Sequence, residues 1–202
     1  MTDPRTVHSP GEGYAAVAIA ASAGGIPALE TLLRELPAAL AVPVLLVQHL
    51  DPRRDTLIAE VLARSTELTV KLAEDGEEPR SGVVHIAPPG RHLTVTAGAV
   101  LALSDAAPVH FVRPSADVLF ESAAIIYGAR LLACVLTGTG RDGADGVSAV
   151  CRHGGTVIVQ DPETAQFGGM PAAAVGACPE ARVLPLEQIA AVIRALVAAP
   201  RR

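Results

Sequence analysis

The sequence predicts an α/β fold: a doubly wound, mostly parallel sheet with helices on both faces and a small antiparallel hairpin insertion. Short, near-continuous apolar runs of strand length alternate with segments that carry apolar side chains at helical spacing. Apolar residues make up 50% of the 202 residues, while aromatic residues make up only 2%. Ala, Val, Leu and Ile must therefore fill thin layers between a sheet and its covering helices.

The N-terminal part of the chain contains two strand-to-helix units. Residues 15–20 form an apolar run, and two glycines after Ser22 precede a helical pattern that opens near Pro27. Residues 42–47 form a second apolar run, and residues 56–63 again have apolar side chains at helical spacing. This alternation predicts βαβ units and hence parallel strands.

The pattern changes in the middle of the chain and then resumes. Three short alternating stretches, separated by Pro and Gly, predict antiparallel hairpins at an edge of the sheet: residues 83–86, 92–96 and 100–103. After them, the expected helices are residues 116–126, a segment through Val147, residues 170–175 and residues 186–197. The expected strands are residues 131–136, 156–159 and 181–184.

Size and charge limit the class of protein. A chain of 20.7 kDa suffices for one domain, and we expect a flexible tail at residues 1–13 and a single domain at residues 14–202. A net charge of -5 and a pI near 5.6 give no general attraction to nucleic acid or to an anionic bilayer. Neither a membrane span nor the apolar stretch of a signal peptide is present. We therefore expect a cytoplasmic protein without membrane insertion.

Cysteine and histidine spacing gives no metal signature. Cys134, Cys151 and Cys178 are odd in number, far apart and without a CxxC pair, which predicts buried, reduced thiols in a reducing compartment. His85 and His92 could approach each other across a hairpin, but no His or Cys pair has the usual ligand spacing. We expect neither a metal nor a cofactor.

Three polar side chains follow predicted strands at the sheet edge where ligands bind in doubly wound folds. They are Ser22, His49 and Asp142. A hydroxyl, an imidazole and a carboxylate are the groups that acyl transfer requires, because a serine is a weak nucleophile until an oriented base removes its proton. Each residue also has a purely structural interpretation: Ser22 as a helix N-cap or turn residue, His49 as a strand-end histidine, and Asp142 as the N-cap of the helix through Val147.

The two glycine turns at this edge also expose backbone amides. The N–H groups of Ala23 and of Thr139 or Gly140 could point at a developing oxyanion. Dinucleotide binding is the alternative use of such a turn. However, the segment after the first strand is not G-x-G-x-x-G, and no Gly-Lys-Ser or Gly-Lys-Thr of a P-loop is present.

At these residues the chain resembles the catalytic domain of the chemotaxis protein-glutamate methylesterases, the CheB-type enzymes. The resemblance extends from about residue 17 to residue 196 and rests on several motifs in order. They are Ala-Ser-Ala-Gly-Gly at 21–25, Val-Gln-His at 47–49, Ile-Ala-Pro-Pro-Gly-Arg-His-Leu at 86–93, Arg-Pro-Ser-Ala-Asp-Val-Leu-Phe at 113–120, Leu-Thr-Gly-Thr-Gly-Arg-Asp-Gly at 136–143 and Phe-Gly-Gly-Met-Pro at 167–171.

The resemblance implies a doubly wound domain with Ser22 as nucleophile, His49 as general base and Asp142 as the acid that orients it. It further implies hydrolysis of glutamate γ-methyl esters on the cytoplasmic helices of chemoreceptors, with release of methanol, and in many members deamidation of receptor glutamines. Two other functions remain open at this stage. The chain could be an inactive scaffold that binds receptor helices, or a methylesterase of a signalling array outside chemotaxis.

The sequence departs from the family pattern at two positions in the turns. The usual Thr after the nucleophile is Ala23, and the Met often found in the second glycine turn is Thr139. Residues 1–13 also leave no room for the N-terminal receiver domain of two-domain relatives. We therefore expect activity without a phosphodonor, and a separate receiver protein is a candidate regulator.

Overall fold

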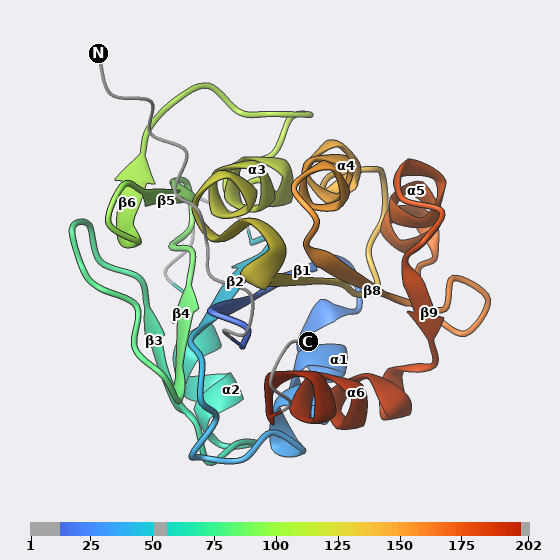
Figure 1. The fold of residues 1–202 in the computed structure, drawn as a ribbon, viewed down its shortest axis with the longest axis horizontal. Coiled ribbons are helices and arrows are strands. Elements are labelled where there is room, and N and C mark those ends of the chain that lie inside the picture. The colour runs from blue at the N-terminus through green and yellow to red at the C-terminus, as the bar shows by residue number, and fades with distance from the viewer. Residues whose placement is uncertain (1–12, 51–55, 199–202) are drawn as a thin grey trace.

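The computed structural model describes residues 13–50 and 56–198. Seven parallel strands form one sheet in the order β3-β4-β2-β1-β7-β8-β9 (Figure 1). These strands are β1 (Ala16–Ala21), β2 (Val44–Gln48), β3 (Thr69–Leu72), β4 (Val83–Ile86), β7 (Leu131–Val135), β8 (Thr156–Gln160) and β9 (Arg182–Leu184). The predicted doubly wound parallel sheet is confirmed. Residues 1–12 of the predicted tail lie outside the described residues.

Helices cover both faces of this sheet. In Figure 1, α3, α4 and α5 lie on one face, and α1, α2 and α6 lie on the other. Their bounds are α1 (Gly25–Arg34), α2 (Ile58–Ala63), α3 (Ala116–Tyr127), α4 (Ala144–Arg152), α5 (Gly169–Ala177) and α6 (Leu186–Ala198). Among the described residues, none of these helices combines the length and apolar character needed to cross a membrane.

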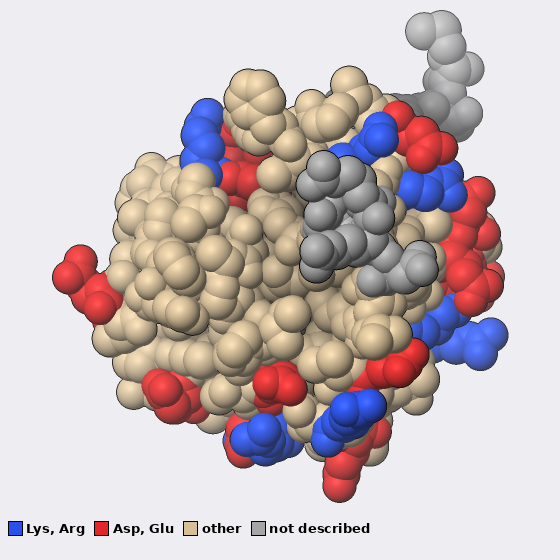
Figure 2. All heavy atoms as spheres, turned by 180° about the vertical axis from the view of Figure 1, so that it is seen from behind, with Lys and Arg blue, Asp and Glu red and all other residues tan. Residues whose placement is uncertain are grey.

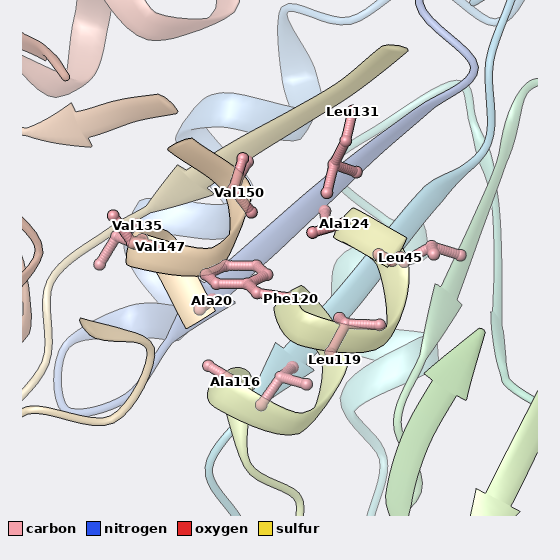
Figure 3. Close-up of a cluster of buried hydrophobic side chains, with 14 of the residues drawn as sticks. Ala20, Leu45, Ala116, Leu119, Phe120, Ala124, Leu131, Val135, Val147 and Val150 are labelled. Atoms are coloured by element: carbon pink, nitrogen blue, oxygen red, sulfur yellow. The ribbon is translucent and has the colours of Figure 1, made fainter. Parts of the chain in front are cut away.

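The central strand β1 presents side chains of different size to the two faces. Val17 and Ile19 pack toward α1, α2 and α6. The side chains toward α3, α4 and α5 are Ala16, Ala18 and Ala20. These small residues leave room for Phe120, which is fully buried among β1, α3 and α4 (Figure 3). Helix α4 approaches α3 closely at Gly146, where an added Cβ would lie 2.7 Å from the Cβ of Phe120.

The prediction for the middle of the chain is correct in part. Strands β5 (His92–Thr96) and β6 (Val100–Ser104) pair antiparallel as a separate two-stranded sheet, as expected for the hairpin insertion. Residues 83–86 are not part of a hairpin: β4 lies inside the main sheet, parallel to both β2 and β3. Strand β3 was not predicted from the sequence, because it is short, half-exposed and without a continuous apolar run.

The cysteine prediction is wrong for two of the three residues. Cys151 at the end of α4 and Cys178 at the end of α5 form a disulfide, with a Cα–Cα distance of 6.4 Å. Packing of the two helices brings together cysteines that are 27 residues apart, which sequence spacing alone does not reveal. Cys134 in β7 is a free, buried thiol, as expected. Burial raises its pKa to about 12.

Candidate active site

The strand order places three loops side by side. β1 lies between β2 and β7 in the sheet, and all three strands run parallel. Ser22 follows β1, His49 follows β2, and residues 137–143 follow β7. We call residues 22–25 the β1 turn and residues 137–143 the β7 turn. Because parallel strands end at the same edge, side chains from these loops meet there.

Ser22, His49 and Asp142 form a hydrogen-bonded chain at this edge. The Oγ of Ser22 lies 3.0 Å from the Nδ1 of His49, and the Nε2 of His49 lies 2.7 Å from the Oδ2 of Asp142. An ionised carboxylate only accepts hydrogen bonds, so Nε2 carries the ring proton and Nδ1 is free to accept the hydroxyl proton of Ser22. The ring nitrogens are thus used in the opposite order from the serine-protease triad, in which Nε2 faces the serine.

The backbone rather than the side chain of Ser22 holds the β1 turn. The Ser22 N–H donates to the Thr137 carbonyl at 3.0 Å, and its own carbonyl accepts from the Gly25 N–H at 2.9 Å. The N-cap position of α1 belongs to Gly24, whose φ of 71° is in the left-handed region that favours glycine. Ser22 is therefore not the N-cap of α1, and its hydroxyl points to His49.

Gln48, the last residue of β2, is a site residue to which the sequence analysis assigned no role. Its side-chain amide is 3% exposed and donates to the backbone carbonyls of Ser22 (2.9 Å) and His49 (3.0 Å). Gly25 makes room for it, because an added Cβ would lie 2.0 Å from the Gln48 Oε1. A polar residue directly after a continuous apolar run was the signal in the sequence.

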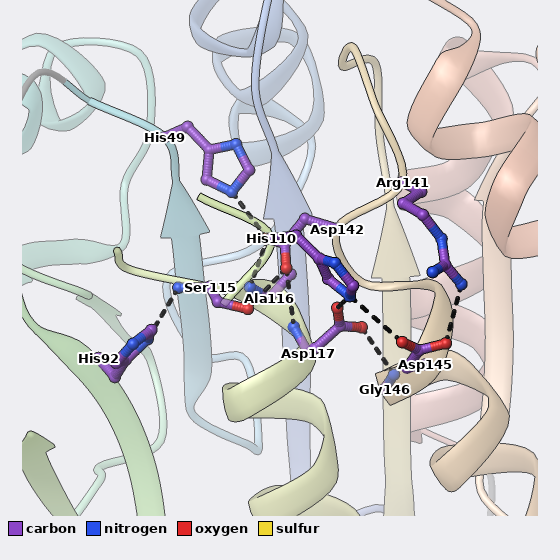
Figure 4. Close-up of polar contacts among 10 residues, drawn as sticks. All are labelled: His49, His92, His110, Ser115, Ala116, Asp117, Arg141, Asp142, Asp145 and Gly146. Atoms are coloured by element: carbon purple, nitrogen blue, oxygen red, sulfur yellow. Dashed lines mark hydrogen bonds and ion pairs between the residues drawn. The ribbon is translucent and has the colours of Figure 1, made fainter. Parts of the chain in front are cut away.

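Asp142 caps a different helix from the one predicted. The N-cap of α4 is Gly143, whereas the Asp142 carboxylate accepts hydrogen bonds at the N-terminus of α3 (Figure 4). Its Oδ2 accepts from the Ala116 N–H at 2.7 Å, and its Oδ1 accepts from the Ser115 hydroxyl at 2.6 Å. Burial alone raises the pKa of Asp142, but hydrogen bonds from His49, Ser115 and Ala116 outweigh it and lower the pKa. The carboxylate is therefore held ionised.

A second carboxylate, Asp117, lies next to Asp142, but its pKa is raised rather than lowered. Its backbone N–H lies 3.4 Å from the Asp142 Oδ1, and its own Oδ1 accepts from the Gly146 N–H at 2.8 Å. Burial, reinforced by the charge of Asp142, raises the pKa of Asp117 to about 6 despite that hydrogen bond. Of two adjacent buried acids, only Asp142 has enough donors to remain charged well below neutral pH.

The predicted oxyanion-binding amides lie in the two turns. Within the described part of the chain, no hydrogen bond uses the N–H of Ala23, Thr139 or Gly140. By contrast, the Gly138 N–H donates to the Phe167 carbonyl at 2.9 Å. Gly138 packs directly on Ser22, since an added Cβ would lie 2.9 Å from the Cβ of Ser22. The three unused amides remain available to an external acceptor.

A cleft of about 180 Å³ opens beside His49. The loop that precedes α3 forms one wall, and Phe111 in this loop is fully exposed. The lining residues are His49, Leu50, Gly90, Pro108, Phe111, Val112, Arg113 and Pro114. The cleft gives a side chain of another molecule access to the imidazole.

His85 and His92 do not approach each other as ligands. The Nδ1 of His85 lies 3.0 Å from Glu77 Oε1, whereas the ring of His92 bonds the Ala107 carbonyl at 3.1 Å. Burial lowers the pKa of His85. Each histidine thus has its own protein partners.

Figure 2 shows the surface opposite to the view of Figure 1. Basic and acidic side chains lie close to one another around the margin of this face, and neutral residues occupy much of its centre. No extended area of positive charge is visible on this face, of the kind that attracts a polyanion.

The fold and this site define a doubly wound α/β protein with a Ser-His-Asp constellation at the carboxyl edge of its sheet. The family model of the CheB methylesterase matches residues 17–193. The chain belongs to the CheB methylesterase family, and the resemblance noted in the sequence is confirmed.

Relatives support this assignment. The crystal structure of the Thermotoga maritima CheB methylesterase catalytic domain superposes with a TM-score of 0.87 at 38% identity, covering 92% of this chain and all of that one. A Leptospira interrogans protein is 41% identical over 177 residues, 88% of this chain and 92% of its own length. Protein-glutamate methylesterase/protein-glutamine glutaminase 2 of Caulobacter vibrioides is 42% identical over 86% of this chain, which spans only 51% of that relative.

Proposed function

We propose that this protein hydrolyses glutamate γ-methyl esters on the cytoplasmic helices of chemoreceptors and releases methanol. One observation carries the proposal: the continuous hydrogen-bonded chain from the Ser22 hydroxyl through His49 to Asp142. Such a chain activates a serine for acyl transfer. The names of the curated relatives point to the same ester, and the substrate implies a cytoplasmic location.

In the first half of the reaction, the Ser22 Oγ attacks the ester carbonyl carbon while His49 Nδ1 takes the hydroxyl proton. Negative charge develops on the carbonyl oxygen, where the amides of Ala23 and of Thr139 or Gly140 donate hydrogen bonds. Collapse of the tetrahedral intermediate breaks the bond to the methoxy group. The leaving oxygen receives the proton from His49, so methanol departs and the glutamyl group remains esterified to Ser22.

In the second half, His49 takes a proton from water, and the resulting hydroxide attacks the acyl-enzyme. The Ser22 oxygen leaves with the proton from His49, which restores the enzyme and frees the glutamate. Asp142, held ionised by its four donors, stabilises the imidazolium in both halves. A glutamine side chain follows the same steps with ammonia as the leaving group, which agrees with the second activity in the names of the relatives.

The two departures from the family pattern are compatible with this mechanism. Ala23 and Thr139 contribute backbone amides to the proposed oxyanion site, and a backbone amide is present whatever the side chain. Loss of a threonine or methionine side chain at these positions therefore leaves the proposed donors in place.

The test is methanol release from methylated chemoreceptor membranes by the purified protein and by Ser22→Ala. We expect wild-type protein to release methanol and the variant to lose at least about a thousandfold in kcat, because removal of a triad nucleophile abolishes the covalent route. Ser148→Ala is the matched control, since among the described residues the Ser148 hydroxyl bonds only Arg152 on α4.

Two results would contradict the proposal. A wild-type protein that binds receptor membranes but releases no methanol would be a scaffold. A Ser22→Ala variant that kept more than a few per cent of the activity, with contaminating esterases excluded, would mean that Ser22 is only a turn residue.

A further inference from the structure

Beside the proposed active site, three side chains that the mechanism does not use converge on one point. His110 comes from the loop before α3, Asp117 from the first turn of α3, and Asp145 from the first turn of α4 (Figure 4). One ligand atom from each lies within 4.8 Å of the others. The His110 Nε2 is 3.3 Å from the Asp145 Oδ2 and 3.5 Å from the Asp117 Oδ2.

Both carboxylates are oriented by a second hydrogen bond. The Asp117 Oδ1 accepts from the Gly146 N–H at 2.8 Å, and the Asp145 Oδ1 accepts from the Arg141 guanidinium at 3.0 Å. In each case the other oxygen, Oδ2, is left facing the imidazole of His110. Metal sites hold their carboxylate ligands in this way, with one protein donor fixing each ligand from behind.

The Asp117 Oδ2 is an independent sign of a missing partner. Asp117 is 3% exposed, and among the described residues this oxygen has no hydrogen-bond partner although it is buried. Leaving a carboxylate oxygen buried without a donor is costly. The His110 Nε2 is too distant, at 3.5 Å, to count as a good hydrogen bond. A cation between the two groups would satisfy both.

From this geometry we propose that His110, Asp117 and Asp145 bind a divalent transition-metal ion of the Zn²⁺ class. Tetrahedral coordination with bonds of about 2.1 Å separates neighbouring ligand atoms by about 3.4 Å, close to the observed 3.3 and 3.5 Å. The imidazole ligand favours zinc-class ions over Ca²⁺ and Mg²⁺, which take oxygen ligands. Because His110 and Asp145 are partly exposed, water completes the coordination.

The site is adjacent to the triad and separate from it. Asp117 is next to Asp142, and its backbone N–H lies 3.4 Å from the Asp142 Oδ1, but none of the three ligands bonds Ser22 or His49 in the described structure. Ester hydrolysis as proposed above needs no metal. Metal binding is therefore the test of this proposal, and methanol release does not test it.

The experiment is titration of the untagged, oxidised protein, first treated with a chelator and desalted, with Co²⁺ as a spectroscopic substitute for Zn²⁺. We expect saturable binding of one ion with the intense visible absorption of tetrahedral Co²⁺, displaced by Zn²⁺. His110→Asn and Asp145→Asn should each weaken binding by more than the 10- to 100-fold typical of removing a supporting residue, and Arg141→Gln by about tenfold. Asn tolerates the left-handed φ of 48° at position 110.

His49→Asn and His153→Asn are the matched controls, because they remove the triad imidazole and the histidine that follows α4. Their Co²⁺ affinity should stay within about twofold of wild type, well below the effect of losing a ligand. Absence of tetrahedral Co²⁺ absorption in the wild type would overturn the proposal and leave the cluster as an ion pair of His110. Undiminished binding by His110→Asn and Asp145→Asn would overturn it as well.

Discussion

The β1 turn and the β7 turn differ in what holds their functional side chains, although both follow central strands at the same edge. In the β1 turn, Ser22 is placed by nearby backbone: Gly24 provides a left-handed residue, and Gly25 donates to the Ser22 carbonyl. In the β7 turn, the carboxylate of Asp142 is held by the N-terminus of another helix, through Ser115 just before α3 and Ala116 at its start.

A buried glutamine from a neighbouring strand holds each turn, again in a different way. Gln48 at the end of β2 donates to the Ser22 carbonyl, whereas Gln160 at the end of β8 accepts from the Thr137 N–H at 2.8 Å. Ser22 is thus held through its backbone by its own turn and by the adjacent strand ends, whereas Asp142 is held through its side chain by the N-terminus of a helix. Substitutions in the two turns should therefore separate effects on rate from effects on stability.

The largest effect is expected from Asp142→Asn. An amide carries no charge to stabilise the imidazolium of His49, and its NH₂ must face neighbours that are themselves hydrogen-bond donors. We expect kcat for methanol release to fall on the order of a thousandfold or more. The free energy of unfolding should fall by about 1–3 kcal/mol, because the N-terminus of α3 loses a charged acceptor.

Urea unfolding and steady-state kinetics measure the two quantities, and Asp161→Asn is the control, because Asp161 is a half-buried turn residue whose carboxylate accepts only from the Glu163 N–H among the described residues. If Asp142→Asn lost stability but kept kcat within about threefold, far from the effect known for triads, Asp142 would act only as a helix cap.

Gly138→Ala tests the contact between the two turns. The new Cβ would lie 2.2 Å from the Met170 Sδ and 2.9 Å from the Ser22 Cβ. The thioether can move, but the Ser22 Cβ moves only with its backbone. We expect kcat to fall about a hundredfold, since displacement of a reacting group by about 1 Å has an effect of that order.

Gly176→Ala in α5 is the control, because its added Cβ would meet nothing within 4 Å. It should leave kcat unchanged and stabilise the helix by about 0.5–1 kcal/mol. Unaltered kcat in Gly138→Ala would show that the β1 turn does not depend on contact with the β7 turn.

Ser115→Ala tests the tertiary support of Asp142. The fully buried Ser115 hydroxyl donates to the Asp142 Oδ1 at 2.6 Å, and hydrogen bonds to charged groups contribute about 1.5–3 kcal/mol. We expect the unfolding free energy to fall by this amount and kcat by about tenfold, as for residues that orient a functional group.

Ser122→Ala on the same helix removes hydrogen bonds to the Val118 and Leu119 carbonyls and the acceptor of the Val95 N–H. It should lower stability without changing kcat. Equal kcat values in the two variants would leave Ser115 with a purely structural role.

Sequence reasoning placed Ser22, His49 and Asp142 at one edge of the sheet, where the structure brings them together, because all three follow apolar strands and parallel strands end at one edge. It did not identify the residues that hold them. Asp142 precedes α4 in the chain, so the sequence favoured that helix as its partner, whereas the packing of α3 against α4 decides the actual one. Contacts between residues 26 positions apart, as for Asp142 and Ala116, follow no periodic pattern.

The fold shows the same limit. Continuous apolar runs predicted the central strands β1, β2 and β7 well, because strands buried on both faces have that pattern. At the other strands the pattern is weaker. β4 resembles a hairpin strand by its length and alternation, yet β2 and β3 pair with it on both sides.

The smallest effects, and the sharpest comparison, come from Gln48→Met and Gln160→Met. Gln48→Met removes the two side-chain N–H bonds to the Ser22 and His49 carbonyls, but the Ser22 carbonyl keeps its bond from the Gly25 N–H. The substitution also removes the Gln48 Oε1, a buried acceptor without a partner among the described residues. These contributions offset each other, so we expect a loss of about 1 kcal/mol in stability and a decrease of a few-fold in kcat, from a less restrained Ser22 and His49.

Gln160→Met should have the opposite outcome, with a larger loss of stability and a smaller loss of kcat than Gln48→Met. Its Oε1 is the acceptor of the Thr137 N–H, and a buried N–H without an acceptor costs about 1–3 kcal/mol. Gln160 contacts neither Ser22 nor His49, so kcat should remain near the wild-type value while stability falls more than in Gln48→Met. Urea unfolding and methanol release by the two variants provide the four numbers needed. If Gln160→Met lowered kcat more than Gln48→Met, the β7 turn rather than the β1 turn would govern the position of the nucleophile.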